Sequence, residues 1–158
     1  MSVTHFHADR PEHNAGVLAS LGLPRAHVLI IDDNRASQAL CASYCDLFDH
    51  RSVTASACPE AIEALGRHRF DVAVVNVDMP GADGLDVVSA IRRLARSKPI
   101  VPLVGLIART RADEAQRWKA AGLAAVVVKP VTARALFAAI RSALEPPGPG
   151  PRSWASAI

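Results

Sequence analysis

The sequence predicts an α/β fold in which helices cover both faces of a five-stranded parallel sheet. Two observations carry this prediction. Five short apolar runs are spaced along the chain, and a segment with helical periodicity follows each of them. Runs without polar alternation are typical of strands that are buried on both faces of a parallel sheet. The alternation therefore indicates one doubly wound (βα)5 domain, which we place at residues 27–144.

Each predicted strand is a short run in which Val, Ile, Leu and Ala dominate, as expected of a buried strand. The first run is the most continuous of the five, and the second is the weakest. The predicted strands cover residues 27–31, 52–55, 72–75, 102–107 and 124–128.

Each predicted helix follows a strand, and several carry a recognisable start or stop. Pro59 suits a first helical turn, and Thr110 with Asp113 forms a capping box. Thr132 can cap the last helix, and Gly122 is expected to end the fourth in the left-handed conformation. The predicted helices cover residues 35–48, 58–67, 85–95, 110–121 and 133–144.

The first predicted helix places Leu40, Tyr44 and Leu47 on one side, which we expect to be its apolar face. Cys41 and Cys45 lie four residues apart and share one face of the same helix. The three cysteines of the chain have no metal-type spacing, so packing is the expected role of this pair, with redox sensing or metal binding as the alternative.

Composition and charge exclude several classes of protein. The chain has 158 residues, of which 50% are hydrophobic and 4% aromatic, so the core must be built mainly from aliphatic side chains. No apolar run approaches the roughly 18 residues of a membrane span, and the first residues do not form a secretory signal. A formal net charge of +3 falls short of a nucleic-acid footprint. We therefore expect neither a membrane nor a nucleic-acid partner, and the odd count of three cysteines favours a reducing cytoplasm.

The two ends of the chain are expected to lie outside the folded unit. Residues 1–26 form an N-terminal extension that glycine and proline interrupt, and its histidines, His5, His7 and His13, are expected to be solvated. Residues 145–158 begin with a run of proline and glycine and predict a flexible tail.

Five residues are predicted to converge at one edge of the sheet. Right-handed crossovers leave few topologies, and the flavodoxin-like order 2-1-3-4-5 is the usual one for five strand–helix units. In such a sheet ligands bind beyond the carboxyl ends of the strands, beside the switch in strand order. The residues at those ends are Asp32, Asp33, Asn76, Ile107 and Lys129.

Three separated motifs at these strand ends resemble the receiver domain of two-component response regulators. The motifs are the run 28–34 with its acidic pair, Met79-Pro80 with Gly84, and Lys129-Pro130. The resemblance covers the whole of 27–144, and the run 32–35 is especially similar to receivers attached to hybrid histidine kinases. It implies a role in bacterial two-component (phosphorelay) signal transduction.

The resemblance also implies a role for each pocket residue. In the family the acidic pair, here Asp32 and Asp33, holds Mg²⁺ together with a phosphoacceptor aspartate and a backbone carbonyl, here that of Asp78. The lysine, here Lys129, pairs with the transferred phosphoryl group. Asn76 stands at the phosphoacceptor position.

Three departures from the family pattern affect this chemistry. Asn76 offers an amide, which is not nucleophilic and coordinates a hard cation less strongly than a carboxylate. Ile107 replaces the serine or threonine that reads the phosphoryl group, and Val126 replaces the switch aromatic. We therefore predict a pseudo-receiver that is not an enzyme, requires no cofactor and binds Mg²⁺ weakly or not at all. One or both of Asp32 and Asp33 are expected to pair with Lys129 and hold the strand ends together, with weak residual metal binding as the alternative.

The resemblance implies partners of the phosphorelay type. A histidine kinase, a phosphotransfer protein or another receiver is expected to dock on helix 35–48, or on the face formed by 110–121, 124–128 and 133–144. The latter face also suits a homodimer, because the last helix is expected to expose an apolar surface. The residues of that surface are Ala133, Ala135, Leu136, Ala138, Ala139 and Ile140.

Two rival functions remain open from the sequence. The first is a phosphorylatable receiver that uses Asp78 or a deamidated Asn76 as acceptor. The second is a sensor of a cyclic-dinucleotide-type ligand, for which arginines beside an indole are suited. The arginine clusters are Arg109, Arg111 and Arg117 with Trp118, and Arg92, Arg93 and Arg96 with Lys98.

Overall fold

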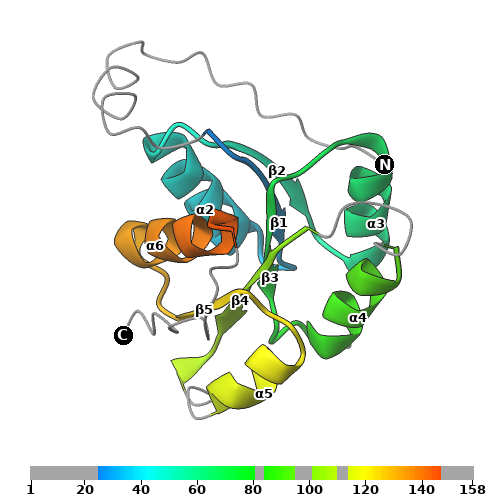
Figure 1. Ribbon diagram of the computed structural model, residues 1–158. Coiled ribbons are helices and arrows are strands. Elements are labelled where there is room, and N and C mark those ends of the chain that lie inside the picture. The colour runs from blue at the N-terminus through cyan, green and yellow to red at the C-terminus, as the bar shows by residue number, and fades with distance from the viewer. Residues whose placement is uncertain (1–24, 81–83, 95–100, 110–113, 147–158) are drawn as a thin grey trace.

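Strands and helices alternate along the part of the chain that the structure, a computed structural model, describes: residues 25–80, 84–94, 101–109 and 114–146 (Figure 1). The strands are β1 (His27–Ile31), β2 (Arg51–Ala55), β3 (Val72–Asn76), β4 (Leu103–Ile107) and β5 (Ala125–Val128). The helices are α2 (Arg35–Leu47), α3 (Cys58–Arg67), α4 (Gly84–Leu94), α5 (Ala115–Ala120) and α6 (Ala133–Leu144). Most of the predicted extension and tail lies outside the described residues.

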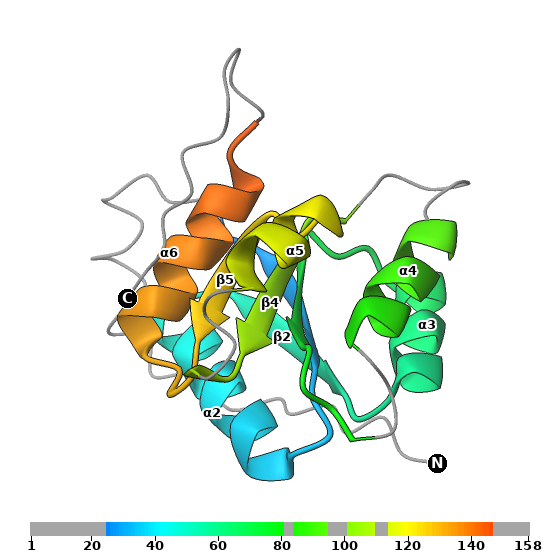
Figure 2. The ribbon, with the colours of Figure 1, turned by 90° about the horizontal axis from the view of Figure 1, so that it is seen from below.

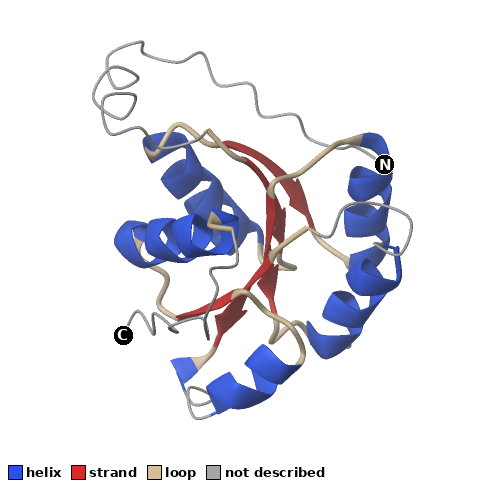
Figure 3. Cartoon of the chain, viewed as in Figure 1, coloured by secondary structure: helices blue, strands red, loops and turns tan. Residues whose placement is uncertain are grey.

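The strands form one parallel sheet in the order β2-β1-β3-β4-β5, which confirms the predicted fold class and topology. β1 lies in the middle of the switch in strand order, with β2 on one side and β3 on the other. Figure 3 shows the sheet running between two layers of helices. The carboxyl ends of β1 and β3 therefore lie side by side, beyond Ile31 and at Asn76.

Helices cover both faces of the sheet, and a separate core fills each side. α2 and α6 cover one face, while α3, α4 and α5 cover the other (Figure 2). Alternate residues of β1 divide between the two cores: Leu29 faces the side of α3, α4 and α5, and Ile30 faces α2 and α6. Burial on both faces explains why these strands read as continuous apolar runs.

Three of the predicted helix signals are confirmed by local geometry. Pro59 lies in the first turn of α3. Thr132 caps α6, since its Oγ1 accepts from the backbone N–H of Ala135 at 3.2 Å. Gly122 follows α5 with φ of +94°, the left-handed conformation that glycine adopts without steric cost. The proposed capping box of Thr110 and Asp113 lies outside the described residues.

The predicted apolar face of the first helix is wrong for two of its three residues, whereas Tyr44 is partly buried and packs against the core. Leu40 is 44% exposed and Leu47 is 50% exposed, whereas Gln38, Cys41 and Cys45 are buried. The buried stripe consists of small side chains and one amide. The glutamine Nε2 donates to the carbonyl of Asp32 at 2.5 Å, so a polar contact helps to select this face.

The expected apolar surface of the last helix is also largely wrong. Leu136, Ala139 and Ile140 are buried in the core under α6. The exposed positions of α6 include Arg134 and Arg141. An apolar stripe on a helix that covers a sheet is needed for the core, so it leaves a charged outer side.

Among the described residues, no helix combines the length and apolar character needed to cross a membrane.

Candidate functional site

A polar pocket lies at the carboxyl edge of the sheet, where the sequence predicted it. Asp32 is fully buried directly after β1, and Asn76 is buried as the last residue of β3. Asp33 is exposed, and Lys129, directly after β5, is partly buried. Hydrogen bonds join these four side chains into one network.

Asp32 is the most fully bonded acid of the pocket. Its Oδ1 accepts from the backbone N–H of Asn34 at 2.9 Å, and its Oδ2 accepts from Ser37 Oγ at 2.5 Å. Asn76 Nδ2 donates to the same Oδ1 at 3.1 Å. These donors satisfy a buried carboxylate that would otherwise be costly to desolvate.

Asn76 uses both ends of its amide. Nδ2 donates to Asp32 Oδ1 and, over a longer 3.5 Å, to Asp33 Oδ1. Oδ1 accepts from Lys129 Nζ at 2.8 Å and from the backbone N–H of Asp78 at 3.0 Å. These partners fix the orientation of the amide, because carboxylates can only accept and the ammonium can only donate.

The expected direct pairing of Lys129 with the acids is wrong. In the part of the chain that the structure describes, no ion pair joins Lys129 to Asp32 or Asp33. The Asn76 amide lies between the carboxylates and the ammonium group. It donates to Asp32 and Asp33 and accepts from Lys129. Lys129 is also anchored by its backbone, whose N–H donates to the carbonyl of Ile107 at 2.9 Å.

The side chain of Asp78 points away from the pocket centre, as predicted. Its Oδ2 accepts from the backbone N–H of Ala108 at 2.6 Å, in the loop that follows β4. Its own backbone N–H donates to Asn76 Oδ1. Asp78 therefore links the end of β3 to the end of β4.

The two positions at which the family resemblance implies switch residues belong to the apolar core. Ile107 and Val126 are both buried in the core on the side of α3, α4 and α5. Trp118 of α5 is fully buried in the same core. The three side chains fill space on this side of the sheet by apolar packing.

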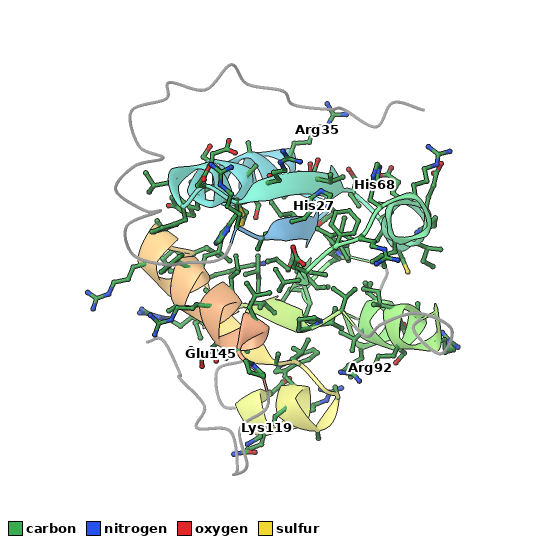
Figure 4. The ribbon with its side chains drawn as sticks, turned by 45° about the horizontal axis from the view of Figure 1, so that its top comes forward. His27, Arg35, His68, Arg92, Lys119 and Glu145 are labelled. Carbon is green, nitrogen blue, oxygen red and sulfur yellow. The ribbon has the colours of Figure 1, made fainter. Side chains whose placement is uncertain are left out.

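Burial of Trp118 counts against the ligand-sensor hypothesis, because a base cannot stack on an indole that is enclosed by the core. Arg117 lies over that ring at 5.7 Å and pairs with Glu114 at 3.4 Å. Arg92 donates to the carbonyl of Gly122, so α4 is tied to the end of α5 (Figure 4). Arg109 is exposed, and Arg93 lies in the last turn of α4; Arg96, Lys98 and Arg111 fall outside the described residues.

Sequence reasoning missed a polar connection between the pocket and the loop after β2. Gln38 Nε2 donates to Ser56 Oγ at 3.2 Å as well as to the carbonyl of Asp32. Glu60 accepts from the backbone N–H of Ser56 at 2.7 Å. A signal existed in the sequence, because Gln38 shares the i, i+3, i+7 stripe of Cys41 and Cys45.

The pocket does not fit Mg²⁺ in the observed arrangement. Mg²⁺ requires oxygen ligands, yet Asn76 turns its NH₂ group toward Asp32 and Asp33. Its oxygen is already engaged by Lys129 and by the backbone of Asp78. A cation between the acids would therefore meet a hydrogen-bond donor at the central position.

Three buried titratable groups lie outside the hydrogen-bond network of the pocket. Burial raises the pKa of Cys41 to about 11 and that of Cys45 to about 12, which keeps both thiols protonated. Burial lowers the pKa of His50, whose Nδ1 accepts from the backbone N–H of Ala26 at 3.1 Å. Its Nε2 is buried without a hydrogen-bond partner among the described residues.

The fold and the pocket together define a class of protein: a receiver-like α/β domain with its polar site beside the switch in strand order. The chain belongs to the response regulator receiver domain family, whose model matches residues 28–141. The family places it in two-component signalling.

Individual relatives agree with this assignment. The chain is 33% identical over 141 residues to the virulence sensor protein BvgS of Bordetella bronchiseptica, which covers 82% of this chain but 11% of BvgS. It is 33% identical over 112 residues to the response regulator protein FleR of Pseudomonas aeruginosa, covering 71% and 23% of the two chains. The solved chemotaxis response regulator CheY4 of Vibrio cholerae has a TM-score of 0.67 and 27% identity, covering 77% of this chain and all of CheY4. The chain thus spans a small part of its larger relatives.

Proposed function

We propose that this receiver domain acts by protein–protein contact and does not accept a phosphoryl group. The observation that carries the proposal is the Asn76 amide, which donates to the acids and accepts from Lys129. An aspartate at this position could accept but could not donate. The amide therefore gives the pocket a closed set of hydrogen bonds that the usual acceptor residue does not allow.

Charge supports the same proposal. With Asn76, two carboxylates face one ammonium group; with an aspartate, three carboxylates would face it. Crowded carboxylates repel and call for a metal ion or a bound proton. The amide removes that requirement, so the pocket needs no cofactor to persist.

The positions that would transmit a phosphorylation signal also favour the proposal. Ile107 has no hydroxyl to bond a phosphoryl oxygen. Val126 has no aromatic ring whose rotation could accompany a switch. Both side chains are buried in a packed core with Trp118. Close packing resists rotamer changes, so we propose that this side of the domain keeps one conformation.

The decisive experiment is incubation of the full chain with acetyl phosphate and Mg²⁺, followed by intact mass spectrometry and peptide mapping. We expect no stable gain of about 80 Da, the mass of one phosphoryl group. The Asn76→Asp variant is the positive control, since it restores the acceptor carboxylate. A gain that maps to Asp78 or to residue 76 of the unaltered chain would sink the proposal and support the first rival. The same spectra show whether Asn76 has deamidated, which adds about 1 Da.

For the partner, we propose a histidine kinase or phosphotransfer protein that docks on α2. Leu40 and Leu47 are the large hydrophobic side chains found exposed in the described residues, and seven positions separate them on one helix. Residues at i and i+7 lie on the same face, so together they offer an apolar contact strip.

This docking surface can be tested with a purified phosphotransfer domain from the same genome. Leu40→Gln and Leu47→Gln are each expected to weaken binding about tenfold, which corresponds to the loss of one apolar contact of about 1.4 kcal/mol. Arg134→Gln on the exposed side of α6 is the matched control. If Arg134→Gln weakens binding and the two leucine variants leave it unchanged, the partner docks on α6 instead.

A further inference from the structure

Asp78 connects the pocket to Ala108, the first residue after β4. Its backbone N–H donates to Asn76 Oδ1 at 3.0 Å, and its Oδ2 accepts from the N–H of Ala108 at 2.6 Å. Ala108 directly follows Ile107, the last residue of β4. One side chain thus spans the carboxyl ends of two neighbouring strands.

The N–H of Ala108 needs an acceptor beyond the sheet. On one side of β4 the bonds end where Val77 donates to the carbonyl of Leu106 at 3.1 Å. On the other side they end where Lys129 donates to the carbonyl of Ile107 at 2.9 Å. A backbone N–H at this point must find a partner outside the ladder, and a carboxylate supplies a stronger bond than a neutral oxygen.

We propose that the Asp78 carboxylate permanently holds Ala108, the first residue after β4, against the pocket, and we call this contact the latch. The proposal rests on the proposed function, because a fixed anion is useful where no phosphoryl group arrives to make such a contact. The Ile107 side chain has no polar group that could make this contact. The backbone N–H of the next residue, Ala108, makes it instead. Asp78 is a positioning residue, and it sets the path by which the chain leaves β4.

The latch can be tested by amide hydrogen exchange of the full chain, followed by NMR without any phosphodonor. In Asp78→Ala, exchange of the Ala108 amide should accelerate roughly 10- to 100-fold, the factor that corresponds to one hydrogen bond to a charged group. Asp78→Asn keeps a neutral acceptor and should give a smaller acceleration. Asp86→Ala removes an exposed acid in the first turn of α4 and should leave the Ala108 amide unchanged.

Either of two results in Asp78→Ala would overturn the latch. One is an unchanged Ala108 exchange rate in Asp78→Ala. The other is an equal acceleration at Ala108 and throughout β1, which would indicate a global loss of stability in place of a local contact. If Asp78→Ala does not fold, Asp78→Asn decides the matter, and a rate equal to that of the unaltered chain rejects the latch. Either failure leaves the proposed function intact, because that function depends on the phosphodonor experiment alone.

Discussion

Replacing Asn76 by aspartate tests the central network directly. The change exchanges an NH₂ donor for a carboxylate oxygen and leaves the size of the side chain almost unaltered. The 3.1 Å bond to Asp32 becomes a contact between two anions, and the 2.8 Å bond from Lys129 becomes an ion pair.

The size of the effect follows from these contacts. Loss of a hydrogen bond to a charged group costs about 1.5–3 kcal/mol. Repulsion from Asp32 and attraction to Lys129 act over similar distances and are each about 5–6 kcal/mol at an effective dielectric constant of about 20, so they nearly cancel. The exposed Asp33 adds a small, screened repulsion. We expect Asn76→Asp to lower the free energy of unfolding by about 2–4 kcal/mol without divalent cations.

Urea unfolding in EDTA and in Mg²⁺ measures this effect. Mg²⁺ at 100 times its dissociation constant would return about 2.7 kcal/mol to the variant, whereas the unaltered chain should gain little. Asn34→Asp is the matched control: it adds the same charge beside the pocket, and its side chain still caps α2. If Asn76→Asp matches the unaltered chain in EDTA, the amide network does not stabilise the fold and our reasoning about the pocket is wrong.

Three further predictions concern groups outside the pocket. Burial lowers the pKa of His50 below its usual 6.5, so the folded state resists a proton that the unfolded chain accepts. The stabilisation from His50 is therefore present above pH 6.5 and is lost as the pH falls through the folded pKa. In urea titrations at several pH values, His50→Gln should flatten the dependence of the unfolding free energy on pH. Equal slopes for the variant and the unaltered chain would contradict this prediction. A thiol reagent should label native protein at Cys58 and spare Cys41 and Cys45, the two buried cysteines of α2. Intact mass measures the number of labels, and rapid labelling of all three cysteines would contradict the prediction. Gly105→Ala should lower the free energy of unfolding by about 1–3 kcal/mol, because its Cβ would lie 2.6 Å from Leu123 Cδ1. Gly66→Ala in α3 meets open space and should raise the free energy of unfolding by up to about 1 kcal/mol. Equal unfolding midpoints of the two variants would refute this packing argument.

The fold could be predicted because its signals are local and repeated. Continuous apolar strands, a glycine after α5 and a threonine before α6 each act within a few residues, and each was confirmed. The apolar face of α2 could not be predicted in the same way. Leucine is more hydrophobic than cysteine or glutamine, yet the helix buries Gln38 because its amide meets the carbonyl of Asp32. That contact depends on the register between helix and strand, which periodicity alone does not supply.

The site could be predicted as a set of positions but not as a set of contacts. Topology alone brings Asp32, Asn76 and Lys129 to one edge of the sheet. Which atoms then bond depends on side-chain reach, and the expected acid–lysine pair gave way to an amide between them. Asp78 illustrates the same limit, because its acceptor role toward Ala108 depends on the close approach of two loops that are thirty positions apart in sequence.

The three departures from the receiver pattern differ in how the structure accommodates them, and this difference decides what one reversal can achieve. Asn76 is held by polar contacts, so an aspartate there restores an acceptor at the cost of those contacts. Ile107 and Val126 are held by the core beside the fully buried Trp118, where a hydroxyl or a larger ring must displace packed neighbours. We therefore propose that one substitution regains an acceptor carboxylate but does not regain the elements that respond to it. With Asp78 already bonded to the loop after β4, a phosphorylated Asn76→Asp variant is expected to carry the modification without moving α5.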